Sequence, residues 1–453
     1  MNSLIVLFVF LIVVVSFCIA TSKKIVLNPQ VCFVVSFIPQ VFYAFFLKDV
    51  WDIYLCDTTV YIYFVGILNF VIVSLIVSFN NNRIHNVHLK IKNKKTGGRG
   101  DIYSSMYQGQ GRAFIIQKWK LVLFICFQIF AILLASRSLI QVTGASSLGQ
   151  AASLYNSVNK YGKEPYHLPF VIGQFRHICE ASGYIWAYYL ASSIVYKNKK
   201  NRSLLLVNFV LSMISPMILG QRLGSVRMVC AFAFMIYVIY GSKVGWKFRV
   251  KGSTVIKTII IIAIIPLAFY YSLDLMGRST ERTLMEYLGI YLSGELKIFD
   301  TFVRKGEFGR AFLESQTIST IIRYIAKWFN ISNLGQKDYY PFLYVAGISI
   351  GNASTIFYNY YLDGGYLGVI IYTGILAFIS QLSFRRAISN DNGHVKISLI
   401  AYCYIFFCLI FAFFDDFFFK QVVSPIFAFY IVYWMLIRWF IKLKIKVERV
   451  RKS

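Results

Sequence analysis

The sequence predicts an all-α, polytopic membrane protein, a transmembrane helical bundle of about eleven spans with one large outer loop. Of its 453 residues, 58% are hydrophobic and 15% are charged, whereas roughly a quarter of the residues in a soluble chain are charged. The apolar residues come in blocks close to the ~20 residues that a helix needs to cross the hydrocarbon core of a bilayer. Most basic residues gather between these blocks.

The apolar blocks give the predicted spans in order along the chain. A run such as LIVLFVFLIVVV shows no alternation of apolar and polar residues, so it favours a helix over a strand of a membrane barrel. The predicted spans cover residues 3–20, 31–47, 60–79, 121–140, 169–196, 203–219, 226–241, 258–275, 364–384, 397–414 and 423–441.

The charge of the loops predicts their sidedness, because cytoplasmic loops carry the excess of Lys and Arg. One set of alternate loops holds 29 basic residues and three acids: 21–30, 80–120, 197–202, 242–257, 385–396 and 442–453. The C-terminus is therefore expected in the cytoplasm and the N-terminus outside. The net charge of +28 is then a signal of topology, and no nucleic-acid partner is expected.

One integrated domain is expected, with spans one to eight in residues 1–275 and an outer loop over 276–352. Spans nine to eleven and a basic cytoplasmic tail occupy 353–453. Apolar residues three and four apart predict an amphipathic helix in the outer loop: Leu284, Leu288, Tyr291, Leu292, Leu296 and Phe299. A second such segment covers about 311–329. These helices are expected to lie on the outer membrane boundary and cap a cavity, or else to form a small packed cap without a ligand.

Charged residues near the outer ends of the spans are the candidate functional residues, because charges in a membrane are costly and normally face protein or a watery cavity. Six arginines from four stretches of chain share this predicted depth: Arg137, Arg176, Arg222, Arg227, Arg278 and Arg282. Arginine binds phosphate oxygens in pairs, so the cluster predicts an anionic ligand such as a pyrophosphate. The competing interpretations are arginines that extend to lipid headgroups and a structural Arg176–Glu180 pair.

Other polar residues leave alternatives open. His177 is either a base or a packing residue, and Asp363, where span nine is expected to begin, is either a helix N-cap or a general base. Lys420 beside Asp415 and Asp416 is expected to lie in an exposed turn without a role. The histidines and cysteines lack the spacing of a zinc site, so no metal or cofactor is expected.

With these features the chain resembles the O-antigen polymerase family of bacterial surface-polysaccharide pathways. The resemblance rests on the span count, the outer loop before the last three spans, ILGQRLGSVRMVCAFAFMIYVIY at 218–240 and YLDGGYLGVIIYTG at 361–374. It implies a metal-independent, inverting-type glycosyltransferase at the periplasmic face of the bacterial inner membrane. The growing glycan would leave one undecaprenyl diphosphate and join the repeat unit on another.

The resemblance also implies roles for the candidate residues. The arginines would hold the diphosphates of the lipid-linked donor and acceptor, and the base would be one of four residues: His177, Glu180, Glu281 or Asp363. The implied partners are the two lipid-linked oligosaccharides, the bilayer and a chain-length regulator protein.

Other functions compete with this one. An O-antigen ligase uses lipid A core as its acceptor and has no separating signature. A flippase or transporter would place polar residues through the full depth of the bundle and show repeat symmetry. A metal-dependent transferase would use the acids of the first outer loop, Asp49, Asp52 and Asp57, and a structural scaffold would not account for Arg176 and Glu180.

Overall fold

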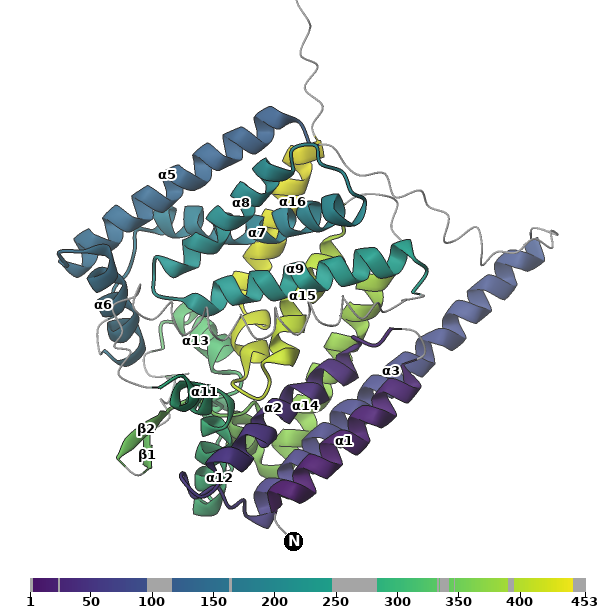
Figure 1. Ribbon diagram of the computed structural model, residues 1–453, viewed down its shortest axis with the longest axis vertical. Coiled ribbons are helices and arrows are strands. Elements are labelled where there is room, and N and C mark those ends of the chain that lie inside the picture. The colour runs from purple at the N-terminus through teal and green to yellow at the C-terminus, as the bar shows by residue number, and fades with distance from the viewer. Residues whose placement is uncertain are drawn as a thin grey trace, which may run out of the picture. The chain divides into compact units, whose positions relative to one another are not determined.

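Helices form nearly all of the regular structure in the computed structural model (Figure 1). The structure describes residues 3–22, 25–95, 116–162, 165–246, 283–331, 334, 342–345, 347–389 and 395–442. Within them lie α1 (Ser3–Thr21), α2 (Pro29–Leu47), α3 (Asp57–Lys95), α5 (Lys118–Thr143), α6 (Leu148–Tyr161), α7 (Phe170–Val195), α8 (Arg202–Met217), α9 (Arg222–Lys243), α11 (Leu284–Leu292), α12 (Gly294–Lys305), α13 (Ser319–Trp328), α14 (Phe357–Ile388), α15 (Ile397–Ile410) and α16 (Pro425–Lys442). A short 3-10 helix, η2 (Phe312–Glu314), a π-helix, η3 (Phe418–Val422), and an antiparallel hairpin of β1 (Leu343–Val345) and β2 (Ile348–Gly351) complete them. The helical class is confirmed, and the hairpin is an unpredicted addition.

Seven of the described helices are long and apolar enough to cross a membrane: α1, α2, α3, α5, α9, α14 and α16. Three more predicted spans also form helices, the 26-residue α7 and the shorter α8 and α15. The span predicted at 258–275 lies outside the described residues. A multi-pass helical membrane protein is therefore confirmed, and the number eleven stays a prediction.

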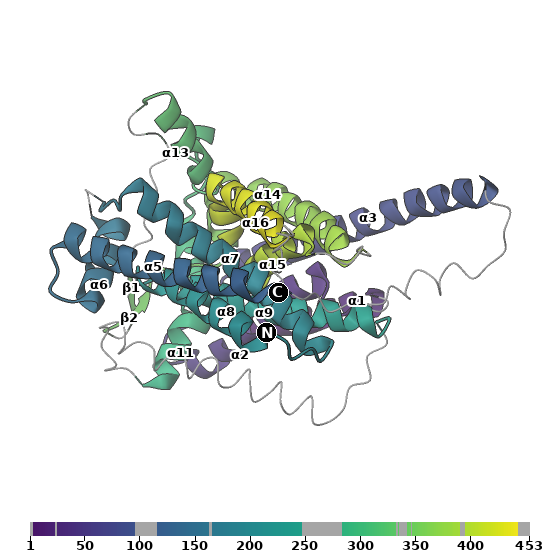
Figure 2. The same cartoon turned by 90° about the horizontal axis from the view of Figure 1, so that it is seen from above.

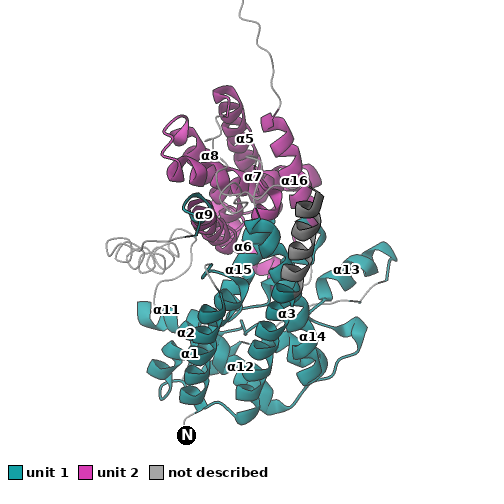
Figure 3. Ribbon diagram, turned by 90° about the vertical axis from the view of Figure 1, so that its right-hand side faces the viewer, with its two compact units in different colours: residues 1–109, 241–390, 401–427 teal, residues 110–240, 391–400, 428–453 magenta. Residues whose placement is uncertain are grey.

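Two compact units divide the chain (Figure 3). Unit 1 comprises residues 1–109, 241–390 and 401–427 and contains α1 to α3, α11 to α14 and the hairpin. Unit 2 comprises residues 110–240, 391–400 and 428–453 and contains α5 to α8 with most of α9 and α16. The domain boundaries expected at 275 and 352 stay predictions.

Aromatic rings hold α2, α3 and α14 together in unit 1. Phe33 of α2 stacks on Phe70 of α3 with ring centroids 4.0 Å apart, and Phe37 stacks on Phe357 of α14 at 5.4 Å. Gly66 of α3 makes room for the Phe357 ring, since a Cβ there would lie 2.3 Å from it. A larger residue at Gly66 would therefore force α3 and α14 apart, and stacked rings such as these contribute about 0.5–1.5 kcal/mol beyond their burial.

The helix α14 is interrupted near its start. It begins at Phe357, before the predicted first residue 364, and departs from helical geometry at Gly364 and Gly365. Gly365 has a φ of +57°, which favours glycine, and the Phe308 ring lies 3.0 Å from the place of its missing Cβ. The two glycines therefore permit both the break and the close approach of the outer loop.

The amphipathic helix predicted through residues 284–299 forms as two helices, α11 and α12, which meet at Ser293. The apolar residues of α12 are buried: Leu296, Ile298, Phe299, Phe302 and Val303. The segment predicted at 311–329 forms η2 and α13, whose apolar residues are largely exposed. The same amphipathic pattern thus gives α12, whose apolar face is buried in the protein, and α13, whose apolar residues are largely exposed.

In unit 2, α5, α7 and α8 pack side by side (Figure 2). The buried Gln128 amide of α5 donates to the Ser182 hydroxyl of α7 at 3.2 Å and to the Ser212 hydroxyl of α8 at 2.7 Å. Gly183 of α7 lets the helices approach, because a Cβ there would lie 2.7 Å from the Met228 sulfur and 2.8 Å from the Ser212 Cβ. This packing fixes the helix that carries Arg176.

Candidate functional site

Three of the predicted arginines are buried in unit 2. Arg176 is 9% exposed, Arg222 is 8% exposed and Arg227 is 9% exposed. Placing one arginine at the centre of a membrane helix costs about 2.5–3.5 kcal/mol on insertion scales. Three such groups in one small unit therefore require a specific explanation.

Arg176 of α7 belongs to a buried polar network that reaches α16. Its guanidinium forms an ion pair with Glu180, four residues on, and Tyr430 of α16 donates its hydroxyl to the second carboxylate oxygen of Glu180. Arg176 Nη2 also lies 3.3 Å from each ring nitrogen of His177. The His177 and Tyr430 ring centroids are 5.9 Å apart. Such a network in a low-dielectric site holds its members in fixed positions.

Further contacts hold α16 against α7 beside this network. Tyr433 donates its hydroxyl to the side-chain oxygen of Gln174, and Trp434 Nε1 donates to the carbonyl of Ala181 at 2.9 Å. The turn of α16 that follows Tyr430 is therefore held against α7. No sequence signal assigned these residues a role, although tyrosines three apart, as at 430 and 433, lie on one face of a helix.

Arg222 and Arg227 lie in the first two turns of α9. The turn before them depends on Gly220, whose φ is +70°, and the Ser225 hydroxyl donates to the carbonyl of Met213 in α8 at 2.6 Å. The start of α9 is thereby fixed to the end of α8. The N-terminus of a helix also carries a partial positive charge that favours anions.

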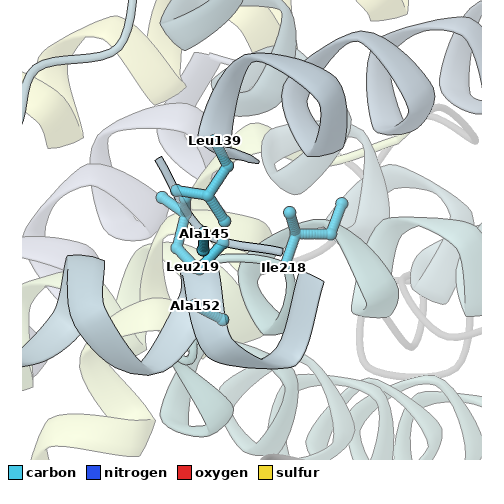
Figure 4. Packing of buried hydrophobic residues seen from close by; sticks show 6 residues of the cluster. Leu139, Ala145, Ala152, Ile218 and Leu219 are labelled. Carbon is cyan, nitrogen blue, oxygen red and sulfur yellow. The ribbon is translucent and has the colours of Figure 1, made fainter. Parts of the chain in front are cut away.

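The ends of four helices meet at this end of unit 2. The Ser215 hydroxyl, near the end of α8, donates to the carbonyl of Arg176 at 3.3 Å, so Arg176 lies close to the turn that leads to Arg222. Figure 4 shows the apolar cluster that joins α5, α6 and this turn: Leu139, Ala145, Ala151, Ala152, Ile218 and Leu219. Arg176, Arg222 and Arg227 therefore lie at one end of the unit, and their role stays a prediction.

The remaining predicted phosphate ligands differ from these three. Arg137 lies in α5 near the apolar cluster and is exposed. Arg278, Arg282 and the base candidate Glu281 lie outside the described residues. The candidate site is accordingly defined by Arg176, Arg222 and Arg227.

Charge is unbalanced in this unit. Among the residues of unit 2 that the structure describes, Glu180 is the single carboxylate. It already accepts hydrogen bonds from Arg176 and Tyr430. Among the described residues of unit 2, basic side chains therefore outnumber acidic ones.

An apolar hollow of about 310 Å³ runs along the same helices. Its walls come from α5, α7 and α16: Phe124, Phe127, Ile178, Leu436, Ile437, Trp439 and Phe440. Ile178 follows His177 directly in the chain. The hollow therefore lies along α7 and the C-terminal half of α16, and its walls are apolar.

Asp363, in unit 1, does not open its helix as expected, because α14 begins at Phe357. Its carboxylate instead accepts the Ser315 hydroxyl at 2.6 Å and the backbone N–H groups of Gln316 and Thr317, both at 2.9 Å. It thereby caps the turn before α13 instead of its own helix. Both of its oxygens are occupied, which favours a structural role over that of a general base.

The prediction of an exposed turn around Lys420 is wrong. Lys420 forms an ion pair with Asp415, and Asp416 is only 1% exposed. Asp416 accepts the Phe419 N–H at 3.1 Å and the Tyr360 hydroxyl at 3.4 Å. Burial raises the pKa of Asp416 to about 7. The sequence pattern of two acids and a lysine did not reveal that neighbouring aromatic side chains cover this turn.

Comparison with known proteins found no matching family, no matching curated protein and no matching solved structure. The O-antigen polymerase family therefore stays a prediction from the organisation of the chain.

Proposed function

We propose that this chain is a polymerase of lipid-linked oligosaccharides, acting at the periplasmic face of the bacterial inner membrane. It would transfer a growing glycan from one undecaprenyl diphosphate to the repeat unit on another. The observation that carries the proposal is that three buried arginines, Arg176, Arg222 and Arg227, lie near the same helix ends of unit 2. A diphosphate is the anion that such a set suits, because guanidinium binds phosphate oxygens with paired hydrogen bonds.

The apolar hollow supports a lipid-linked substrate over a soluble one. A polyprenyl diphosphate has a charged head and a hydrocarbon tail, and unit 2 contains both buried arginines and an apolar hollow. Burying a hydrocarbon chain stabilises binding by about 0.8 kcal/mol for each CH₂ group. The head would bind to the arginines while the tail follows α7 and α16.

The transfer reaction needs a stabilised leaving group and a proton acceptor. The bond between the sugar C1 and the phosphate oxygen breaks, the diphosphate departs with the electron pair, and the acceptor hydroxyl oxygen bonds to C1. Fixed cations stabilise the charge that develops on the diphosphate, which is the role proposed for the arginines. His177 and Glu180, which both contact Arg176, are the bases proposed for the acceptor proton in this unit.

A deletion strain separates this proposal from its competitors. Loss of a polymerase leaves core capped by a single repeat unit on a polysaccharide gel. Loss of a ligase leaves bare core and accumulated lipid-linked polymer, and loss of a flippase strands single units on the cytoplasmic side. Either of the last two patterns would replace the polymerase proposal with that competitor.

Complementation with Arg222→Ala tests the arginine site directly. We expect no long-chain polysaccharide, although the protein is present in the membrane at the normal level. Arg202→Ala is the matched control, because Arg202 begins α8, whereas Arg222 follows the end of that helix. Arg202 donates to the carbonyls of Ser193 and Asn198, so its loss should leave polymerisation in place. Normal polymer in the Arg222 variant would remove this residue from the site.

A further inference from the structure

The helix α13 presents an apolar surface that the described residues of unit 1 leave uncovered. Its Ile325 is 50% exposed and Trp328 is 89% exposed, and Phe329, which follows the helix, is 70% exposed. Unit 1 buries only Ser319, Ile322 and Ala326 of this helix. A soluble surface rarely carries such a contiguous apolar group without a partner.

The residues of α13 divide into three faces. At about 100° per residue, the buried Ile322 and Ala326 lie next to the arc that carries Ile325 and Trp328, so the apolar arc continues beyond the protein contact. Arg323 and Lys327 lie on the remaining side and are exposed. A wide apolar arc with cations on the opposite side is the pattern of a helix in a membrane interface.

The charges of this segment suit a layer of phosphates. Residues 315–331 include Arg323 and Lys327 and no acid. Tryptophan at such a position matches the aromatic belt at the boundary between headgroups and acyl chains. Lipid phosphates on one side and acyl carbons on the other therefore complement both exposed faces.

The attachment of α13 to unit 1 leaves these faces accessible. Figures 2 and 3 show α13 standing off from α14 at the edge of unit 1. The Asp363 carboxylate holds the preceding turn through Ser315, Gln316 and Thr317. The helix is thus held by the turn that precedes it and by its buried face, which leaves the other faces exposed.

From these observations we propose that α13 docks on the phospholipid surface of the outer leaflet. Ile325, Trp328 and Phe329 enter the boundary between headgroups and acyl chains, and Arg323 and Lys327 bind lipid phosphates. The packed helix α12 has no such role, because its apolar face is buried within unit 1. The docking is independent of the proposed glycosyl transfer.

Spin labels on the full-length protein in phospholipid nanodiscs test this docking. Trp328→Cys carries the label on the apolar arc, Lys327→Cys carries it on the cationic side, and the parent chain without the added cysteine gives the background from native thiols. Phe329→Cys is a second apolar position in case Trp328→Cys folds poorly. Accessibility to oxygen, which concentrates in lipid, is compared with accessibility to a water-soluble nickel chelate.

We expect the labels at 328 and 329 to be several-fold more accessible to oxygen than to nickel, and the label at 327 to show the reverse. Equal access to nickel at all three positions would overturn the proposal, because α13 would then lie in water. Immobilised labels at 328 and 329 with little access to either reagent would also overturn it, because a protein would then cover the helix.

Discussion

Units 1 and 2 both contain buried charged side chains, but the hydrogen-bond partners of these side chains differ. In unit 1, the buried Asp300 accepts the Cys56 N–H and the Thr59 hydroxyl, both at 2.8 Å, and Arg304 Nε at 2.7 Å. Asp363 is matched in the same manner by three donors. In unit 2, the single described carboxylate, Glu180, pairs with one arginine, Arg176, and accepts the Tyr430 hydroxyl, whereas Arg222 and Arg227 are also buried.

The difference teaches how to read a buried charge. Carboxylates with a full set of local donors connect loops to helices and need no ligand, as in unit 1. Several buried arginines at one end of a unit, with one described carboxylate, are a candidate for binding an external anion. Each prediction below changes one side of this comparison.

The largest effect is expected from replacing the buried pair of unit 2 by neutral residues. Arg176→Met with Glu180→Gln removes both charges, a change that often leaves protein stability unaffected. If Arg176 only stabilises α7, the double variant will polymerise normally. We expect polymer formation to fall about 100-fold or more, the effect of losing a donor to a developing anion, while the protein elutes as a single species. Polymer yield and size-exclusion profile are the measurements.

A smaller effect, on stability, is expected in unit 1. Asp363→Asn turns an acceptor of three hydrogen bonds into a side chain that places an NH₂ group against other donors. We expect the free energy of unfolding to fall by roughly 2–3 kcal/mol, measured by thermal unfolding in detergent. The exposed Asp49→Asn serves as the control.

Turnover per folded molecule should be retained in Asp363→Asn, because the carboxylate acts on the loop and not on the substrate. Complete loss of turnover in a stably folded Asp363→Asn protein would instead make Asp363 the base.

The pH dependence of stability should be traceable to the buried carboxyl groups of unit 1. Burial raises the pKa of Asp416 from 3.8 to about 7 and that of Glu295 well above its usual range. The folded state then holds these protons more firmly than the unfolded state. The contribution of Asp416 to stability is therefore full below about pH 4 and is lost as the pH rises toward 7.

Thermal unfolding of Asp416→Asn between pH 4 and pH 8 measures this contribution. We expect the unfolding temperature of the variant to fall by several degrees less than that of the natural chain over this pH range. The fall that persists is attributed to Glu295. An unchanged profile would mean that Asp416 is not protonated in the folded protein.

The smallest effect is expected at Arg137. Its side chain is exposed on α5, and exposed arginines near a membrane surface commonly extend to lipid headgroups. Arg137→Ala should leave polymer length and yield close to normal on the same gel. A loss as deep as that of the Arg176 variant would extend the site to α5.

Much of the fold could be predicted because blocks of about 20 hydrophobic residues indicate membrane-spanning helices. The described α1, α5 and α9 follow the predicted spans closely. The break at Gly364 and Gly365 was not predicted, because two glycines in an apolar run do not reveal that the N–H groups of Gly309 and Arg310 bond the carbonyls of Leu362 and Asp363. The outer-loop hairpin was missed because strands of three and four residues have too little pattern.

The charged residues of the candidate site could be identified from the sequence, but their contacts could not. Charged residues in a span stand out in a sequence, so Arg176 and Glu180 were identifiable. Their contact with Tyr430 joins positions 250 residues apart in the chain, and no local pattern encodes such a pair. The same limit applies to Ser215 and Arg176, where a backbone carbonyl is the acceptor.

The measurement that tests the central claim most directly is the affinity of the purified protein for undecaprenyl diphosphate, compared with the uncharged prenol, in chelator. We expect the natural chain to prefer the diphosphate, and Arg176→Ala with Arg222→Ala to lose about 100-fold of that preference, since each charge-assisted hydrogen bond contributes about 1.5–3 kcal/mol. Equal affinity of the natural chain and the double variant for the diphosphate would contradict an anion site at these arginines.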